Sequence, residues 1–295
     1  MEILYYNQDE FLKTAATVAS HKNLEDSNYY YHILDPNDIH FSHLKVTEPK
    51  KLKNLSEMKE LQSFFKIIGL IYDHQEKENY LGYTESKYPR TSFSHQLKEV
   101  GMEDRLTFIS IYFQELDSLI KKGHKHHIVF PNLFSKNSII YDVKEETLHL
   151  SGIDTLQVED YSSTLINPAF HDPRILDRIY NSIKYYDDEQ QLFRPSFDQF
   201  NLMNQFFMYA IGVNLSKELI EREEFGTTMD ETMKRLLNQY GLGNEKELYD
   251  YLKRVYSFEE NRYDLPDAYP YIEKLESNYQ LDSNSHFVKR KRLFM

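Results

Sequence analysis

The sequence predicts an α+β protein in which a small sheet precedes a mainly helical region. The first 85 residues of the 295-residue chain contain short apolar segments separated by polar turns, which is typical of strands. Beyond them, apolar residues recur at three- and four-residue spacing over long segments, which is typical of amphipathic helices. With 40% hydrophobic residues, a chain of this length can bury a substantial core. We expect one unit over residues 1–85 and a second over residues 86–295.

Composition excludes several classes of protein. The net charge of −12 disfavours nucleic acid as the main partner, because phosphate backbones repel an acidic surface. The absence of cysteine excludes disulfides, thiolate nucleophiles and cysteine zinc sites, and fits a reducing cytoplasm. No segment approaches the roughly 20 apolar residues of a membrane helix, and the N-terminus lacks the pattern of a signal peptide. We expect a cytoplasmic protein without a membrane span.

The N-terminal unit is predicted to open with a strand, a helix and two further strands. Glu2 to Tyr6 is a short apolar segment, and residues 9–18 have helical periodicity. Residues 29–34 and 39–46 are expected to be strands, joined by the turn Asp35-Pro36-Asn37-Asp38.

A helix and a hairpin complete this unit. An apolar series from Leu52 to Leu61 recurs every three residues, which predicts a helix over residues 49–65 with Pro49 in its first turn. The apolar runs 66–72 and 79–85 flank a polar turn and are expected to pair.

The second unit is predicted to contain at least five long helices. Residues 104–122 form an amphipathic segment that ends at Gly123, a favourable C-terminal capping residue. Residues 197–212 are more apolar, begin near Asp198 and end at Gly212. Further helices are expected over 229–239, 245–256 and 269–277.

Residues 128–154 carry the chemistry that the sequence suggests. An apolar start leads into a polar loop that ends at Asn137, and two short strands then deliver Asp154. An amide and a carboxylate brought together in this way can share a divalent cation. Ligation by oxygen atoms alone suits Mg²⁺ that also holds a phosphate.

This stretch resembles the catalytic loop and metal-binding segment of protein kinases. Asn137 stands at the position of the metal-binding Asn, and Asp154 at the Asp of Asp-Phe-Gly. Phe130-Pro131-Asn132 replaces His-Arg-Asp, so the catalytic aspartate maps onto Asn132. An amide cannot accept the proton of a substrate hydroxyl as a carboxylate does. The resemblance, which runs over most of residues 29–277, therefore implies a degenerate, pseudokinase-like member of the superfamily.

The resemblance implies a two-lobed fold, with a small antiparallel-sheet N-lobe and a mainly helical C-lobe. Asp198 and Gly212 have the spacing of the large lobe's central helix, whose Asp accepts backbone N–H groups of the catalytic loop in that family. Asp172-Pro173-Arg174 occupies the region of the family's Ala-Pro-Glu, and Arg262 resembles the Arg that pairs with this Glu. The first glycine is Gly69, so the glycine-rich phosphate loop is absent.

The resemblance also assigns a nucleotide site, with ATP and Mg²⁺ as the implied cofactors. Lys45 is the candidate for the strand lysine that grips phosphate, and Glu57 or Glu60 for its helix partner. Leu81 and Tyr83 would lead into the hinge whose backbone meets the adenine. The alternative is that these charges simply lie on a solvated face.

Three functions remain open from the sequence. The first is a pseudokinase-like protein that acts by binding a protein partner. The second is an atypical phosphotransferase or nucleotidyl transferase in which Asp142 or Asp160 replaces the missing base. The third is a scaffold or assembly protein that needs no nucleotide.

Two charged runs lie outside this scheme. His124, His126 and His127 follow one another closely, but so short a loop rarely aims three rings at one metal ion. A solvated helix end is the simpler interpretation. The basic run Lys289 to Arg292 is expected to be a mobile end or a docking segment for an anionic surface.

Overall fold

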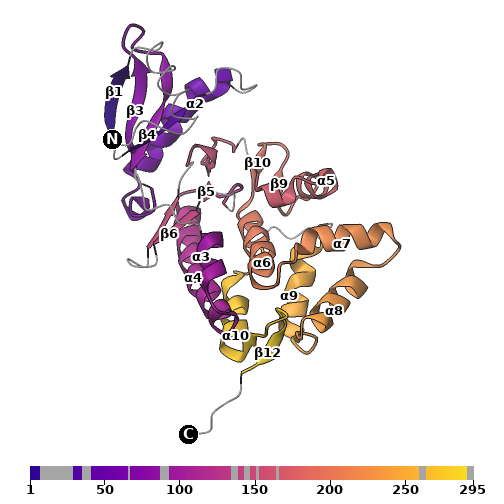
Figure 1. Cartoon of the computed structure of the whole chain (residues 1–295). Helices are drawn as coiled ribbons and strands as arrows, with labels where there is room; N and C mark the ends of the chain where they lie inside the picture. The colour runs from indigo at the N-terminus through magenta and orange to yellow at the C-terminus, as the bar shows by residue number, and fades with distance from the viewer. Residues whose placement is uncertain are drawn as a thin grey trace.

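The protein is α+β, with a small sheet at one end and helices at the other (Figure 1). A computed structural model describes residues 1–6, 29–34, 41–65, 67–86, 93–133, 139–142, 147–150, 153–163, 166–258 and 264–290. The helix expected over residues 9–18 lies outside the described residues, as does Arg262. None of the helices in these ranges combines the length and apolar character that a membrane crossing requires.

The sheet has four strands in the order β1-β3-β4-β2. β4 (Tyr80–Ser86) lies between β3 (Ile67–Asp73) and β2 (Tyr29–Ile33), and both pairings are antiparallel. The pairing of β3 with β4 was expected, whereas β2 was expected to be joined by a turn to a strand over residues 39–46. β1 (Glu2–Tyr6) pairs with β3 in parallel, so the prediction of a purely antiparallel sheet is wrong at this edge. A parallel pair needs a long crossover, and here the intervening chain includes β2 and the helix α2 (Phe41–Glu57).

Helix α2 replaces the strand that was expected over residues 39–46, and the prediction is wrong from residue 41 onward. The helix also ends at Glu57 instead of Phe65, and the short 3₁₀ turn η1 (Lys59–Leu61) follows. Pro49 lies inside α2, where proline costs about 3 kcal/mol. One buried stripe at helical spacing faces the rest of the molecule and offsets this cost. Its residues are Glu48, Lys51, Leu52 and Leu55.

α4, α6, α8, α9 and α10 lie where helices were expected, whereas α7 was not among the predicted helices. α4 extends beyond Gly123, so the prediction that the helix ends at this glycine is wrong. A Cβ atom at Gly123 would lie 2.5 Å from the ring of Phe130, so the position favours glycine. The helices are α3 (Phe93–Glu99), α4 (Met102–Lys125), α5 (Pro173–Tyr180), α6 (Pro195–Ile211), α7 (Leu215–Glu224), α8 (Met229–Gln239), α9 (Lys246–Tyr256) and α10 (Tyr269–Asn278), with the 3₁₀ turns η2 (Ile153–Thr155) and η3 (Pro168–Phe170).

Short antiparallel strand pairs connect these helices. β5 pairs with β8, and β6 with β7, within the region that carries Asn132 and Asp154. The pairs are β5 (Ile128–Val129) with β8 (Gln157–Val158), β6 (Ile139–Asp142) with β7 (Thr147–Leu150), β9 (Tyr186–Asp187) with β10 (Leu192–Phe193), and β11 (Tyr279–Leu281) with β12 (Phe287–Lys289).

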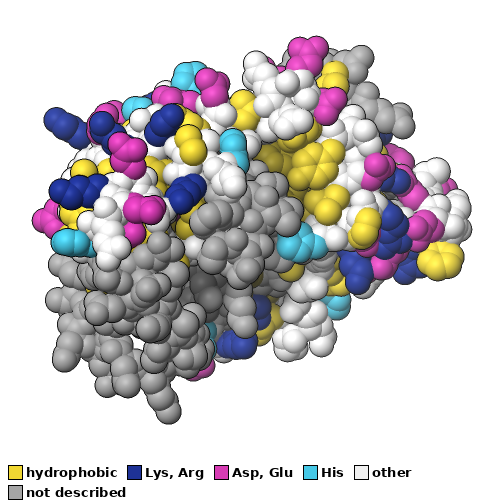
Figure 2. All heavy atoms as spheres, turned by 90° about the horizontal axis from the view of Figure 1, so that it is seen from above, with side chains coloured by type: hydrophobic (Ala, Val, Ile, Leu, Met, Phe, Trp, Pro, Cys, Tyr) yellow, Lys and Arg dark blue, Asp and Glu magenta, His cyan; other side chains and the backbone are white. Residues whose placement is uncertain are grey.

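Helix α6 lies at the centre of the helical part. Apolar residues on all sides of it are buried, which is the pattern of a helix enclosed by others. Gly212 ends the helix with φ of 73°, a left-handed conformation that glycine adopts at little cost. Outside the core, acidic, basic and hydrophobic side chains are interspersed on the face seen from above (Figure 2).

The central strand β4 contains an irregularity at Leu81 and Gly82. Ile71 faces Gly82 and Tyr72 faces Tyr80, so Leu81 is the extra residue of a bulge. Gly82 has φ of 150°, and a Cβ atom there would lie 2.0 Å from the carbonyl oxygen of His32. The position therefore requires glycine.

We expect Gly82→Ala to lower the free energy of unfolding by about 2 kcal/mol or more, because both the strained φ and the clash with a backbone oxygen act against the side chain. Gly101 is the matched control: its φ is −59°, and nothing lies within 4 Å of an added Cβ. Gly101→Ala should change stability by less than about 1 kcal/mol. Urea denaturation measures both, and equal effects would contradict the assignment.

Candidate functional site

The turn that carries Asn132, residues 130–133, is fastened to helix α6 by a buried carboxylate. The backbone N–H of Phe130 donates to Oδ1 of Asp198 at 3.0 Å and to Oδ2 at 3.3 Å. Asp198 is fully buried in the first turn of α6. This is the contact predicted for Asp198, and it fixes the start of the turn.

The same carboxylate holds the end of helix α4. Nε2 of His124 lies 2.8 Å from Oδ2 of Asp198. Burial raises the pKa of the Asp198 carboxyl above its usual value, while the bonds from His124 and from the Phe130 N–H act in the opposite direction. Asp198 thus joins α4, the turn and α6 at one point.

A second link from α6 reaches the next residue of the turn. The backbone N–H of Asn167 donates to the carbonyl oxygen of Pro131 at 2.8 Å. The side-chain amide of Asn167 donates to Oδ1 of Asn201, also on α6, at 2.7 Å. Both Asn167 and Asn201 are buried, so water does not compete for these bonds. Helix α6 therefore holds the turn at Phe130 through Asp198, and at Pro131 through Asn201 and Asn167.

Asn132 itself is buried, with 7% of its surface exposed. The N–H of Leu133 donates to the carbonyl oxygen of Phe130 at 3.1 Å and closes the turn around it. A carboxamide can donate and accept hydrogen bonds, but it does not take up a proton at neutral pH as a carboxylate does. This position can therefore orient a group, but it cannot act as a general base.

The segment around Asp154 lies beside this turn. β5 precedes Asn132 and pairs with β8, with Ile128 opposite Val158 and Val129 opposite Gln157. Asp154 itself lies in η2, just before β8. Asn137 and the Asp154 side chain lie outside the described residues, so the proposed metal ligands remain a prediction.

Helix α2 is docked on the segment that follows Asp154. Nζ of Lys51, which is buried, donates to the carbonyl oxygen of Leu156 at 3.0 Å. Nδ2 of Asn54 donates to the carboxylate of Glu159 at 3.2 Å. These contacts tie the element that packs on the sheet to the region that contains Asp154.

The sequence interpretation missed Lys51 and its neighbour Glu48. Glu48 is buried and accepts a hydrogen bond from the hydroxyl of Tyr80 at 2.5 Å. The signal was present: Glu48 precedes Leu52 by four residues and Leu55 by seven, so it continues the apolar stripe of the helix.

Lys45, Glu57 and Glu60 do not form the expected strand–helix ion pair. Lys45 lies on α2 itself, not on a strand, and Glu57 is the last residue of the same helix. At 1.5 Å per residue the two are separated by about 18 Å along the axis, so they cannot pair. Glu60 lies on η1, largely exposed, 3.9 Å from Nε2 of His126.

Leu81 and Tyr83 lie inside β4 and not in a hinge. Both are buried, and Tyr83 stacks on the ring of His32 with the centroids 4.4 Å apart. Because β4 pairs on both sides, its backbone groups are used within the sheet. A hinge that follows β4 would fall on residues 87–92, which lie outside the described residues.

The three clustered histidines point to separate partners. His124 binds Asp198, His126 lies nearest Glu60, and His127 lines a surface hollow. No group of three or more histidine, aspartate or glutamate side chains in the described ranges is arranged to hold a metal ion. Of the alternative bases, Asp160 is exposed at the same hollow, and the side chain of Asp142 lies outside the described residues.

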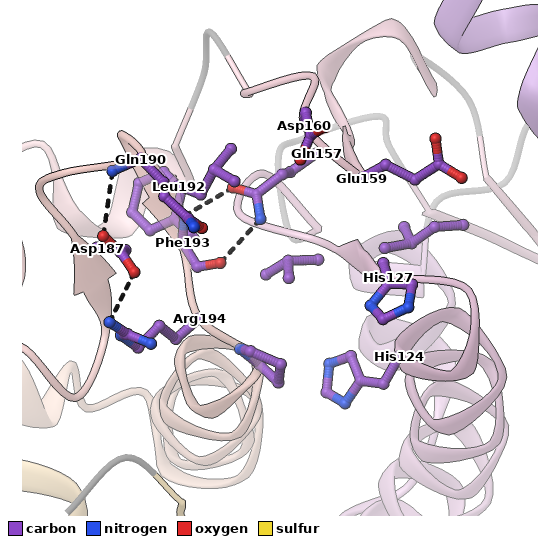
Figure 3. Close-up of a pocket in the computed structure, with 13 residues that line it drawn as sticks. His124, His127, Gln157, Glu159, Asp160, Asp187, Gln190, Leu192, Phe193 and Arg194 are labelled. Atoms are coloured by element: carbon purple, nitrogen blue, oxygen red, sulfur yellow. Dashed lines mark hydrogen bonds and ion pairs between the residues drawn. The ribbon is translucent and has the colours of Figure 1, made fainter.

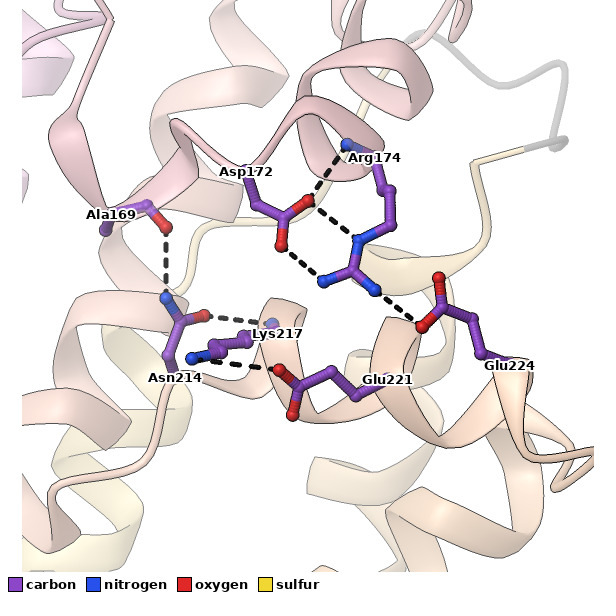
Figure 4. Close-up of polar contacts among 7 residues, drawn as sticks. All are labelled: Ala169, Asp172, Arg174, Asn214, Lys217, Glu221 and Glu224. Carbon is purple, nitrogen blue, oxygen red and sulfur yellow. Dashed lines mark hydrogen bonds and ion pairs between the residues drawn. The ribbon is translucent and has the colours of Figure 1, made fainter.

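An ion pair and a hydrogen bond join the segment from Ala169 to Arg174 to helix α7 and its capping residue Asn214 (Figure 4). Asp172 caps α5 and binds the guanidinium of Arg174, whose hydrogen bonds lower the pKa of this carboxyl to about 2. Arg174 also reaches Glu224 at 2.6 Å, and the side chain of Asn214 donates to the carbonyl of Ala169 at 3.0 Å. Asp172-Pro173-Arg174 therefore has a local structural role.

The sequence matches no family model and no curated protein.

We expect Asp198→Ala to lower the free energy of unfolding by about 3 kcal/mol, because it leaves the buried Phe130 N–H and the half-buried His124 ring without their acceptor. Asp198→Asn keeps an acceptor oxygen and should cost only about 1 kcal/mol. Asp250→Ala, at an exposed position on α9, serves as the control. Urea denaturation measures the three variants. Equal losses for Ala and Asn would contradict an acceptor role.

The raised pKa of Asp198 also predicts a dependence on pH. The folded protein holds this proton more tightly than the unfolded chain, whose carboxyl titrates near 3.8. The contribution of Asp198 to stability should therefore fall as the pH rises from about 3.8 to the raised value. We expect the stability difference, wild type minus Asp198→Asn, to decrease over this window. Unfolding in urea at a series of pH values measures it, and an increase would exclude the assignment.

Proposed function

We propose that the protein is pseudokinase-like: it keeps a two-lobed kinase-like arrangement and acts by binding a protein partner, without efficient phosphoryl transfer. The observation that carries the proposal is the buried Asn132 in a turn anchored by Asp198. The order of elements around it supports the same conclusion. A long helix, the anchored turn, the β6–β7 hairpin, Asp154 and the buried helix α6 follow one another as the resemblance implies.

Loss of the carboxylate at position 132 removes general base catalysis, which contributes roughly 10²–10⁴-fold to reactions of this kind. The turn is held at Phe130 and at Pro131, so a substitute carboxylate would have to come from another element. Asp160, one of the two candidates, is exposed at the hollow beside His124 and His127. The geometry therefore favours binding over transfer.

Mg-ATP is the ligand proposed for the cleft between the lobes. Oxygen ligands from Asn137 and Asp154 fit the chemistry of Mg²⁺, which would neutralise the phosphates there. The pairing of β5 with β8 and the docking of Lys51 on Leu156 would hold the Asp154 segment against the Asn132 turn. A bound nucleotide would in this way stabilise the contact between α2 and the helical part.

We expect ATP with Mg²⁺ or Mn²⁺ to raise the melting temperature of the wild type, and Asp154→Ala to abolish the shift. Ligand at 100 times its dissociation constant stabilises by about 2.7 kcal/mol, which corresponds to about 4 °C for a chain of this size. Asp160→Ala is the control and should keep the shift, because this exposed carboxylate lies at the hollow. Differential scanning fluorimetry with and without metal measures these changes.

Two results would redirect the proposal. Robust transfer of phosphate to a protein or small molecule, lost in Asp154→Ala, would establish the atypical phosphotransferase. Absence of any shift with either metal would favour the scaffold that needs no nucleotide. A partner search would then proceed without ATP.

A further inference from the structure

A hollow of about 490 Å³ opens on the surface beside the end of α4 (Figure 3). The end of α4, with His124, and the turn that follows it, with His127, form one wall, and the β9–β10 hairpin forms the other. β8 and the two residues after it, Glu159 and Asp160, connect the walls. This volume lies within the roughly 300–1,000 Å³ of ligand pockets in proteins.

The walls of the hollow are held in place by internal hydrogen bonds. The side chain of Gln157 binds both backbone groups of Phe193: its amide donates to the carbonyl at 2.8 Å, and its oxygen accepts from the N–H at 2.7 Å. Asp187 accepts from the guanidinium of Arg194 at 2.8 Å and from the backbone N–H of Gln190 at 3.1 Å. The hollow is thus preformed, and a ligand would not have to order it.

The charge of the hollow favours a cation. Among the described residues that line it, Arg194 is the only side chain with a permanent positive charge, and Asp187 compensates it. Glu159 and Asp160 are exposed carboxylates at the rim, and Glu159 accepts a hydrogen bond from the neutral amide of Asn54 at 3.2 Å. At neutral pH the described residues that line the hollow therefore carry two negative charges, on Glu159 and Asp160, that no basic side chain among them compensates.

We propose that the hollow is a second binding site, which takes the guanidinium or ammonium group of a basic segment of a partner polypeptide. Glu159 and Asp160 supply the ionic contacts, and the carbonyl and carboxamide groups of the walls supply further acceptors. The inference rests on the proposed function for the existence of a partner. The site itself needs no nucleotide and is tested without one.

The site is connected to the Asn132 turn through one residue. His124 lines the hollow and binds Asp198, and Asp198 accepts the backbone N–H of Phe130. A cation bound beside His124 changes the electric field at this carboxylate, and thereby the hydrogen bond to Phe130. We therefore expect binding in the hollow to change the strength of the hydrogen bond that anchors the Asn132 turn.

The test is isothermal titration with a synthetic peptide, acetyl-Gly-Arg-Lys-Arg-Gly-amide, in the absence of nucleotide. We expect the double variant Glu159→Gln with Asp160→Asn to weaken binding about tenfold, or about 1.4 kcal/mol, because it removes two exposed ion pairs. The matched control is Asp188→Asn with Glu189→Gln. These exposed acids belong to the β9–β10 turn but do not line the hollow, and their loss changes the net charge by the same amount. The control should bind the peptide within twofold of the wild type.

Each other outcome overturns a stated part of the proposal. No binding of the peptide, or equal weakening in the control variant, would exclude the hollow as the site. L-argininamide that binds as tightly as the peptide would identify a small cation, and not a polypeptide, as the ligand. Binding without a change in the amide NMR signal of Phe130 would exclude the connection to the turn. A failed nucleotide shift with intact peptide binding would affect only the proposed nucleotide site.

Discussion

The rest of this structure depends on the hydrogen bonds that the buried carboxylate of Asp198 makes. Asp198 has no exposed surface, and its carboxylate accepts from the Phe130 N–H while the His124 ring lies against its other oxygen. Removing such a group from water is costly unless its hydrogen bonds are replaced, so burial of Asp198 requires both partners at once. Helix α6, the end of α4 and the turn of Asn132 are thereby fixed relative to one another. Asn167 and Asn201 repeat the arrangement one turn further along α6.

Helix α2 is the second organising element, because it connects the sheet to the region of the turn. Its apolar residues pack on the sheet, while Glu48 and Lys51 on the same buried stripe satisfy the hydroxyl of Tyr80 and the carbonyl of Leu156. A further backbone hydrogen bond, donated by the N–H of Leu150 to the carbonyl oxygen of Phe64, joins β7 to the chain that follows η1. Buried polar contacts of this kind specify one arrangement more strictly than apolar packing does, because a misplaced partner leaves a group unsatisfied.

The sequence predicts most helices because their apolar periodicity is long and uninterrupted, as in α4, α6 and α8. It fails between residues 41 and 46, where a short alternating pattern fits a strand but the longer stripe through Leu52 and Leu55 extends the helix back across it. The backbone contact of Asp198 was expected from the resemblance to protein kinases, to which its spacing to Gly212 contributes. The position of Lys51 on the stripe can be read from the sequence, but its bond to the carbonyl of Leu156 depends on tertiary packing, because a lysine on a helix is ordinarily solvated. The parallel pairing of β1 with β3 also depends on tertiary packing, which the local residue pattern does not encode.

The direction of the effect between hollow and turn follows from electrostatics. A positive charge bound beside His124 favours the ionised form of Asp198, because opposite charges at short range lower the pKa of a carboxyl. The ionised carboxylate is the stronger acceptor for the Phe130 N–H, so the bond that anchors the turn becomes stronger. Binding of a basic segment would therefore stabilise the Asn132 turn, and by thermodynamic linkage a stabilised turn would bind that segment more tightly. Because the carboxamide of Asn132 takes up no proton, we expect this coupling between hollow and turn to involve binding alone and no proton transfer at position 132.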